Sequence, residues 1–158
     1  MYAKRLARRG YSCFAIDYRL APKHKSPAQI DDCRDAVRWI RQHASRYKTD
    51  PGRIGAIGYS AGGHLVAMLG VSGGVKQLEG SLGQHTKLDS RVAAVIDFCG
   101  PTDFLRMNDV AGSIDHDAAD SPESTCRKMP IIGSLVSTRR TRAAASSVPS
   151  QTTTCPAC

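Results

Sequence analysis

The fold of this chain is decided by the stretch RIGAIGYSAGGHLVAMLG at residues 53–70. Its first part is a short apolar run that predicts a buried strand, and its last part is a longer apolar run that predicts a helix. Between the two lies a Gly-x-Ser-x-Gly pentapeptide at residues 58–62, with Ser60 at its centre. A serine in this context stands on a sharp turn at the carboxyl end of a strand, where its hydroxyl is exposed.

Such a turn meets part of what a nucleophilic serine needs. The residues around the serine must be small for the backbone to fold this tightly, and Gly58 and Gly62 satisfy that requirement on either side of Tyr59 and Ser60. The backbone N–H of Ala61 is expected to point to the place where an oxyanion forms, at the positive pole of the helix. The alternative interpretation is a glycine-rich turn whose serine is incidental.

The rest of the chain alternates between helix and strand patterns. The segments in chain order are 1–9 (helix), 11–18 (strand), 28–50 (helix), 54–60 (strand), 61–70 (helix) and 91–100 (strand). The helix over 28–50 has an apolar stripe at Ile30, Cys33, Val37 and Ile40, with acid–base pairs on its outer face. This order predicts an α/β fold with a parallel sheet between helices. A further short helix is expected to begin at Ser121, where a serine precedes a proline.

The composition is that of a globular protein, with 41% hydrophobic and 23% charged residues. No apolar run reaches the 18 residues that indicate a membrane span. The formal net charge is +8, and the excess lies mainly in residues 1–50 and 124–158. A basic balance is compatible with a polyanionic partner, but no nucleic-acid-binding motif accompanies it. We therefore expect no nucleic-acid partner.

The positions of the cysteines indicate a structural role rather than metal binding or redox chemistry. Cys13 and Cys99 fall in strand-like runs and Cys33 falls on the helix stripe, so all three are expected to be small core residues. Cys155 and Cys158 form a C-x-x-C pair, but no second pair of ligands accompanies it. We expect neither a metal site nor an organic cofactor.

The character of the sequence changes at Ser137. Residues 137–158 contain Val148 as their single large apolar residue and so cannot bury a face. We expect one domain over residues 1–136 and a disordered tail over 137–158. A second hypothesis is a shifted reading frame, because the codons of three consecutive threonines, read one base out of phase, specify Asp, Asn, Tyr or His. Sequencing the source DNA across codons 134–158 tests that hypothesis.

Three blocks of sequence together resemble the α/β-hydrolase superfamily; they are DYRLAPKHKSPAQIDDCRDAVRWIRQHA, DPGRIGAIGYSAGGHLVAMLG and AAVIDFCGPTDF. Within it they are similar to the carboxylesterase and lipase group, both hormone-sensitive-lipase-like enzymes and BD-FAE-type acetyl-xylan and feruloyl esterases. The resemblance extends over residues 1–136 and implies a partial α/β-hydrolase fold, with three layers αβα and a mostly parallel sheet. It also implies that the chain is a truncated member of the family.

By this resemblance Ser60 matches the nucleophile, Ala61 matches the second oxyanion donor, and residues 17–20 match a structural block at a strand end. The implied reaction is hydrolysis of a small-molecule or polysaccharide-linked carboxylic ester through an acyl-enzyme, without a cofactor. The family's oxyanion loop, commonly His-Gly-Gly, is not found upstream. Neither compartment nor oligomeric state is indicated.

No late block of the kind that supplies the triad acid and base is found either. The candidates that follow Ser60 are Asp97, Asp103, Asp109, Asp115, Asp117, Asp120, His64, His85 and His116. We expect His64 to be a packed helix histidine and His116 to lie in an exposed polar loop, because a triad base reaches its serine from a separate loop with an acid behind it.

Three hypotheses therefore stay open. The first is an incomplete esterase with little activity. The second is a non-catalytic binding or scaffold fragment that uses its basic helix and tail, for which salt-sensitive binding to polyanions is the test. The third is an active enzyme whose base comes from His116 or a partner chain, for which turnover must depend on Ser60. A peptidase-type relative is a lower alternative.

Overall fold

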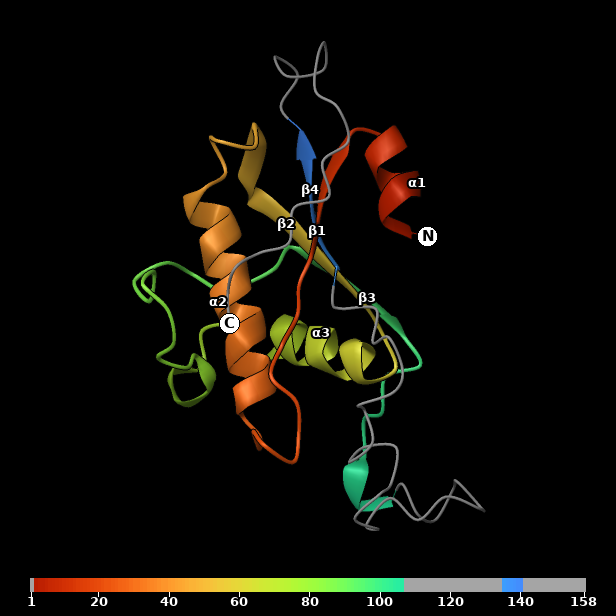
Figure 1. Ribbon diagram of the computed structural model, residues 1–158, viewed down its shortest axis with the longest axis vertical. Coiled ribbons are helices and arrows are strands. Elements are labelled where there is room, and N and C mark those ends of the chain that lie inside the picture. The colour runs from red at the N-terminus through yellow and green to blue at the C-terminus, as the bar shows by residue number, and fades with distance from the viewer. Residues whose placement is uncertain (1, 107–134, 141–158) are drawn as a thin grey trace.

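The computed structural model describes residues 2–106 and 135–140 (Figure 1). In this part of the chain one sheet has the strand order β1-β4-β2-β3. The elements are α1 (Tyr2–Arg8), β1 (Tyr11–Ala15), α2 (Ala28–Gln42), β2 (Thr49–Tyr59), α3 (Ala61–Val71), η1 (Lys76–Leu78), β3 (Ala94–Phe98), η2 (Phe104–Arg106) and β4 (Leu135–Arg140). The short helix expected at Ser121 lies outside the described residues.

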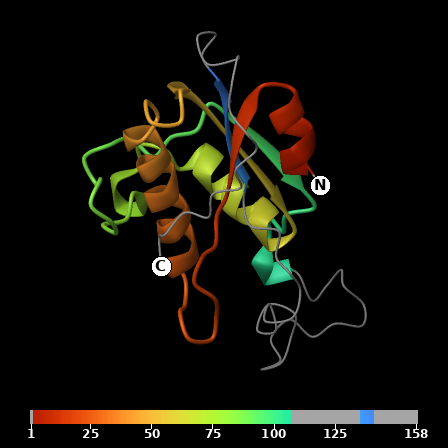
Figure 2. The ribbon, with the colours of Figure 1, turned by 45° about the horizontal axis from the view of Figure 1, so that its top comes forward.

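The elements form three layers. Helices α2 and α3 cover one face of the sheet, and α1 lies on the other face (Figure 1, Figure 2). Strands β2 and β3 are parallel neighbours, while β4 runs antiparallel to both β1 and β2, so β1, β2 and β3 share one direction. The predicted three-layer α/β arrangement is confirmed, with three of the four described strands in one direction, while both pairings of β4 are antiparallel.

Strand β4 is a finding that the sequence pattern did not indicate. It lies between β1 and β2, pairing Phe14 with Val136 on one side and Ala56 with Val136 on the other. The boundary expected between residues 136 and 137 therefore falls inside a strand. Residues 141–158, with the C-x-x-C pair, lie outside the described part, so the rest of the tail prediction is untested.

The core lies between the sheet and the helices α2 and α3. The predicted stripe of α2 is buried as expected, with Cys33, Val37 and Ile40 fully inaccessible. They pack with Ile54 and Ala56 of β2, which alternate with residues on the opposite face of the sheet because successive strand side chains point to opposite faces. The helix expected over residues 28–50 ends at Gln42, and strand β2 begins at Thr49, so this strand is longer than its apolar run.

The expectation that these cysteines are core residues is confirmed for Cys33. Cys33 is buried and Cys13 is half-buried, but Cys99 is exposed. The prediction for Cys99 was wrong because β3 ends at Phe98, and Cys99 lies in the following turn with φ 56°. A residue with positive φ belongs to a turn rather than to a strand in the core.

An ion pair joins the chain just after β1 to α2. Arg19 donates its backbone N–H to Asp32 Oδ2 at 2.8 Å, and its guanidinium contacts Asp32 Oδ1 at 2.8 Å. Asp32 is 7% exposed, so the pair is held away from solvent on one side. Residues 17–20 therefore have a structural contact of the kind that the resemblance implied.

The outer face of α2 is covered, contrary to expectation. Three arginines on the same side of α2 donate hydrogen bonds to the segment between α3 and β3. Arg34 donates to the Ser72 hydroxyl, and Arg38 donates to Glu79. Arg41 donates to the carbonyls of Asp89 and Arg91. Arg34 and Arg38 are 1% and 2% exposed. The prediction of solvent-exposed acid–base pairs failed here because the glycine-rich connection folds back over the helix.

Glu79 is the carboxylate at the centre of this covered face. Burial by itself raises the pKa of Glu79. The hydrogen bonds from the Gly74 N–H and the Ser90 hydroxyl, together with the charges of Arg34 and Arg38, outweigh burial and lower the pKa below its ordinary value of 4.5. Folding therefore favours the ionised carboxylate.

We expect the free energy of unfolding to depend on pH through Glu79. A carboxyl whose pKa is lowered in the folded state stabilises the fold fully at pH values well above 4.5, and this contribution is lost as pH falls through 4.5 toward the lower folded-state pKa. Glu79→Gln should lower stability at pH 7 and have less effect at pH 3. Urea unfolding of both proteins at the two pH values checks this; an equal loss at both would contradict it.

Candidate active site

Ser60 lies between β2 and α3, on the turn that the sequence predicted. It caps the N-terminus of α3 with φ 54° and ψ −121°. A non-glycine residue with positive φ costs on the order of 1–3 kcal/mol and persists only where its surroundings impose it. The Ser60 N–H donates to the Phe98 carbonyl of β3 at 2.8 Å, and the Ser60 carbonyl accepts the His64 N–H at 3.1 Å. The exposed serine is thus held by its backbone.

The glycines of the turn are required by close packing. A Cβ added to Gly58 would collide with the Gly62 carbonyl group and lie 2.7 Å from the Gly63 nitrogen. The strand before the serine and the helix after it therefore touch backbone to backbone. This is the steric requirement for small residues that the pentapeptide suggested.

The other residues of the predicted site lie around Ser60. Ala61 is the first residue of α3, so its N–H belongs to the helix N-terminus, where the N–H groups carry partial positive charge. Gly62 is buried, whereas the Tyr59 side chain is 54% exposed. Tyr59 pairs with Phe98 in the sheet, and Phe98 stacks on Tyr2 of α1 with ring centroids 5.4 Å apart.

The turn after β3 also belongs to the site and was missed by sequence reasoning. Gly100 donates its N–H to Asp97 Oδ1 at 2.9 Å, and a Cβ on Gly63 would lie 2.9 Å from the Gly100 Cα. The first turn of α3 and the turn after β3 are therefore pressed together at two glycines. The available signals were the second glycine after Ser60 and the Cys-Gly-Pro run at the end of β3.

His64 is packed, as predicted. Its Nδ1 lies 2.9 Å from the Pro101 carbonyl, and its ring meets Phe104 edge-on with centroids 4.6 Å apart. Because a carbonyl only accepts, Nδ1 carries the proton in this arrangement. The other described candidate, His85, faces His43 near the end of α2, with ring centroids 5.7 Å apart.

The candidate acids are only partly described. Asp97 is bound to its own turn, and Asp103 is exposed beside η2. Between residues 2 and 106 no hydrogen bond joins a histidine to a carboxylate, so this part of the chain does not contain an assembled triad. His116 and Asp109, Asp115, Asp117 and Asp120 lie outside the described residues.

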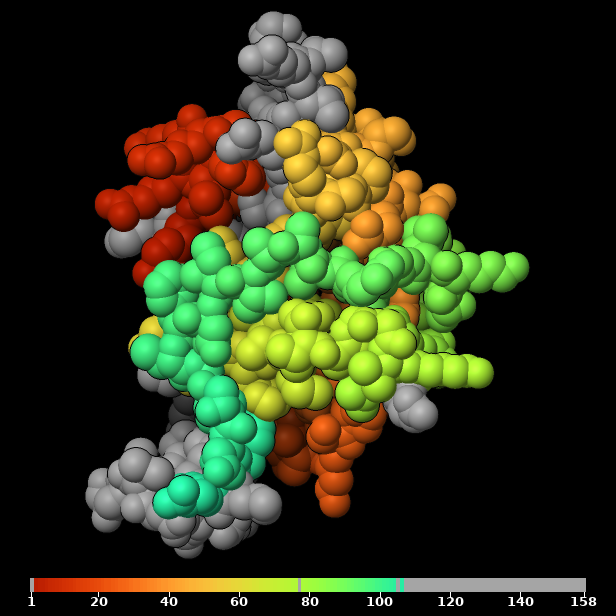
Figure 3. Space-filling model, turned by 180° about the vertical axis from the view of Figure 1, so that it is seen from behind, coloured from red at the N-terminus to blue at the C-terminus, as the bar shows by residue number. Residues whose placement is uncertain are grey.

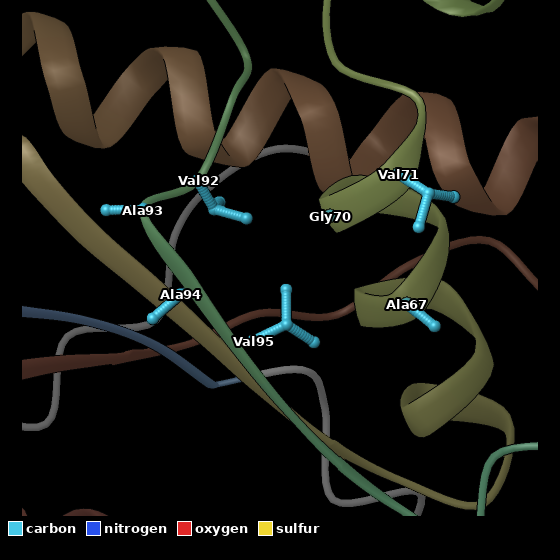
Figure 4. A pocket seen from close by; sticks show the side chains of 7 residues that line it. All are labelled: Ala67, Gly70, Val71, Val92, Ala93, Ala94 and Val95. Carbon is cyan, nitrogen blue, oxygen red and sulfur yellow. The ribbon is translucent and has the colours of Figure 1, made fainter.

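An apolar groove lies at the opposite end of α3 from Ser60. It has a volume of about 440 Å³ and is lined by Ala67, Gly70, Val71, Val92, Ala93, Ala94 and Val95. The segment leading into β3 runs beside α3 on the face seen from behind (Figure 3), and Val92 and Val95 extend toward the helix (Figure 4). Gly70 is about 15 Å along the helix from Ser60, so this groove is separate from the serine.

Within residues 2–106 and 135–140, none of the helices has the length and apolar character of a membrane span. The same residues contain no group of three or more histidine, cysteine or acidic side chains that could hold a metal ion. Lys4, Arg5, Arg8 and Arg9, in and just after α1, are exposed. The hypothesis of a basic binding surface stays a prediction.

Comparison with known proteins places the chain in a family. The BD-FAE family model matches residues 1–150. The chain belongs to the BD-FAE family. This BD-FAE member is 37% identical over 100 residues to Esterase LipC of Mycobacterium tuberculosis, and 36% identical over 104 residues to the probable carboxylic ester hydrolase LipM of the same organism. These matches cover 63% and 66% of the chain, but 24% and 23% of the relatives.

Solved structures agree with this assignment. The BD-FAE chain is similar to a truncated form of a carbohydrate esterase from gut microbiota, with a TM-score of 0.57 and 40% identity over 59% of this chain and 36% of that one. It is also similar to a bifunctional GH43-CE protein of Bacteroides eggerthii, with a TM-score of 0.58 and 36% identity over 68% of this chain and 15% of that one. The chain thus corresponds to a minor part of each relative.

Proposed function

We propose that this chain carries the nucleophile of a serine carboxylic-ester hydrolase. The observation that supports this most strongly is Ser60 itself, an exposed serine at positive φ between a strand and a helix. The hydroxyl oxygen attacks the ester carbonyl, the alcohol leaves, and the acyl group stays on Ser60 until water releases it as the acid. The Ala61 N–H donates to the oxyanion of the tetrahedral intermediate.

The class of substrate follows from the relatives. The two curated relatives above are named as an esterase and a carboxylic ester hydrolase, which favours an ester over a peptide amide. One similar structure is named as a carbohydrate esterase, so a polysaccharide-linked ester is the finer proposal. Base and acid stay unassigned, and the rate is expected to be low if neither is present, because removal of triad members costs several powers of ten.

Turnover of p-nitrophenyl acetate by the 158-residue chain tests this proposal. The expected result is a rate above the uncatalysed background that disappears in Ser60→Ala. Ser81→Ala is the matched control, since Ser81 is an exposed serine in the connection after α3. Equal rates for the parent and Ser60→Ala would contradict the proposal for this chain.

A further inference from the structure

The end of β3 and the turn after it contact Ser60 and the first turn of α3 at three places. The Phe98 carbonyl accepts the Ser60 N–H at 2.8 Å, and the Pro101 carbonyl lies 2.9 Å from His64 Nδ1. Between these two contacts, Gly100 fits against the backbone of Gly63 so closely that neither glycine has room for a Cβ. The position of Ser60 therefore depends on the shape of residues 98–101.

That shape is itself held by Asp97. Its Oδ1 accepts the Gly100 N–H at 2.9 Å, closing the turn across Cys99, whose φ is 56°. An aspartate side chain that bonds to a backbone N–H further along a turn stabilises a conformation that a non-glycine residue seldom adopts alone. The same Oδ1 packs against Gly63 of α3, so the carboxylate touches both halves of the contact.

We propose that Asp97 is a positioning residue for Ser60. It acts through the turn that it closes, fixing the Phe98 and Pro101 carbonyls and hence the serine backbone and the His64 ring. This inference rests on the proposed function, because it concerns the rate of the reaction at Ser60. The function of Asp97 requires a hydrogen-bond acceptor at Oδ1 rather than a negative charge, since its partner is a neutral amide.

The first test follows the His64 imidazole by NMR, which reports its tautomer without any substrate. In the parent, neutral His64 should carry its proton on Nδ1, because the Pro101 carbonyl faces that nitrogen. Asp97→Ala should open the turn and give a mixture of the two tautomers, while Asp97→Asn, which retains Oδ1, should restore the parent signal. An unchanged His64 signal in a folded Asp97→Ala variant would overturn the proposal.

The second test is kinetic. We expect kcat for p-nitrophenyl acetate to fall about tenfold or more in Asp97→Ala with little change in KM, since misplacing a reacting group by a fraction of an ångström has effects of this order. Asp97→Asn should restore most of the rate. If Asp97→Ala loses thermal stability but keeps both kcat and the His64 signal, its role is structural only and the proposal fails.

A matched control shows whether the effect of Asp97→Ala is local or reflects a general loss of stability. Asp50 also accepts a backbone N–H, that of Gly52 at 2.8 Å, in an exposed turn near the start of β2. Asp50→Ala should leave the His64 signal and kcat unchanged; a change as large as that in Asp97→Ala would contradict the positioning role. Absence of Ser60-dependent turnover in the parent would reject the proposed function instead, while the NMR comparison would still decide the role of Asp97.

Discussion

Gly58→Ala is expected to destabilise the fold by about 3 kcal/mol or more, because the added methyl group would have to occupy the place of the Gly62 carbonyl. Backbone atoms cannot rotate away as a side chain does, so α3 must move relative to β2. Such a loss is a large part of the 5–15 kcal/mol that is typical for a domain. Ester turnover should disappear with it, since Ser60 lies between the two displaced elements.

Gly52→Ala is the matched control, because Gly52 is in the same strand. Its Cβ would meet the flexible side chain of Asp50 at 3.3 Å and no backbone atom. Urea unfolding should show a change within about 0.5 kcal/mol for this variant. If Gly58→Ala were as stable as Gly52→Ala, this would contradict the inference that β2 and α3 touch backbone to backbone at Ser60.

Arg38→Met is expected to cost about 3 kcal/mol or more. The guanidinium is 2% exposed and donates to the Glu79 carboxylate at 2.7 Å, the Glu79 carbonyl at 2.6 Å and the Leu88 carbonyl at 3.1 Å. Methionine fills a similar volume but removes the donor from three acceptors, and a hydrogen bond from a charged group typically contributes about 1.5–3 kcal/mol. The connection over α2 should become more accessible to protease.

Arg53→Met is the matched control for Arg38→Met. Arg53 pairs with Asp50 at 2.6 Å, but its side chain is 60% exposed. Exposed ion pairs contribute little to stability, so this variant should unfold at nearly the same urea concentration as the parent. A similar loss in both variants would mean that the arginines of α2 do not hold the connection.

The parts of the fold that sequence reasoning predicted are those specified by local pattern. The stripe of α2 follows from residue spacing, and the turn at Ser60 follows from small residues between two apolar runs. Strand β4 could not be predicted in this way, because residues 135–140 contain two apolar residues in six and no alternation of apolar and polar residues. Its place between β1 and β2 is a long-range pairing, which no local pattern predicts.

The same distinction applies to the candidate site. The pentapeptide is contiguous, so the nucleophile could be predicted from the sequence. Asp97, Gly100 and Pro101 meet the first turn of α3 only because β2 and β3 are neighbours in the sheet. The buried arginines were placed on the surface for a related reason: the pattern of α2 does not show that a later segment covers it.

A fluorophosphonate probe tests directly whether Ser60 is a nucleophile, because the adduct can be located by peptide mass spectrometry. A nucleophilic Ser60 displaces fluoride and forms a bond from its oxygen to phosphorus. We expect one adduct, on the peptide containing Ser60, and none in Ser60→Ala. An unlabelled parent chain, or an adduct that persists in Ser60→Ala, would contradict it.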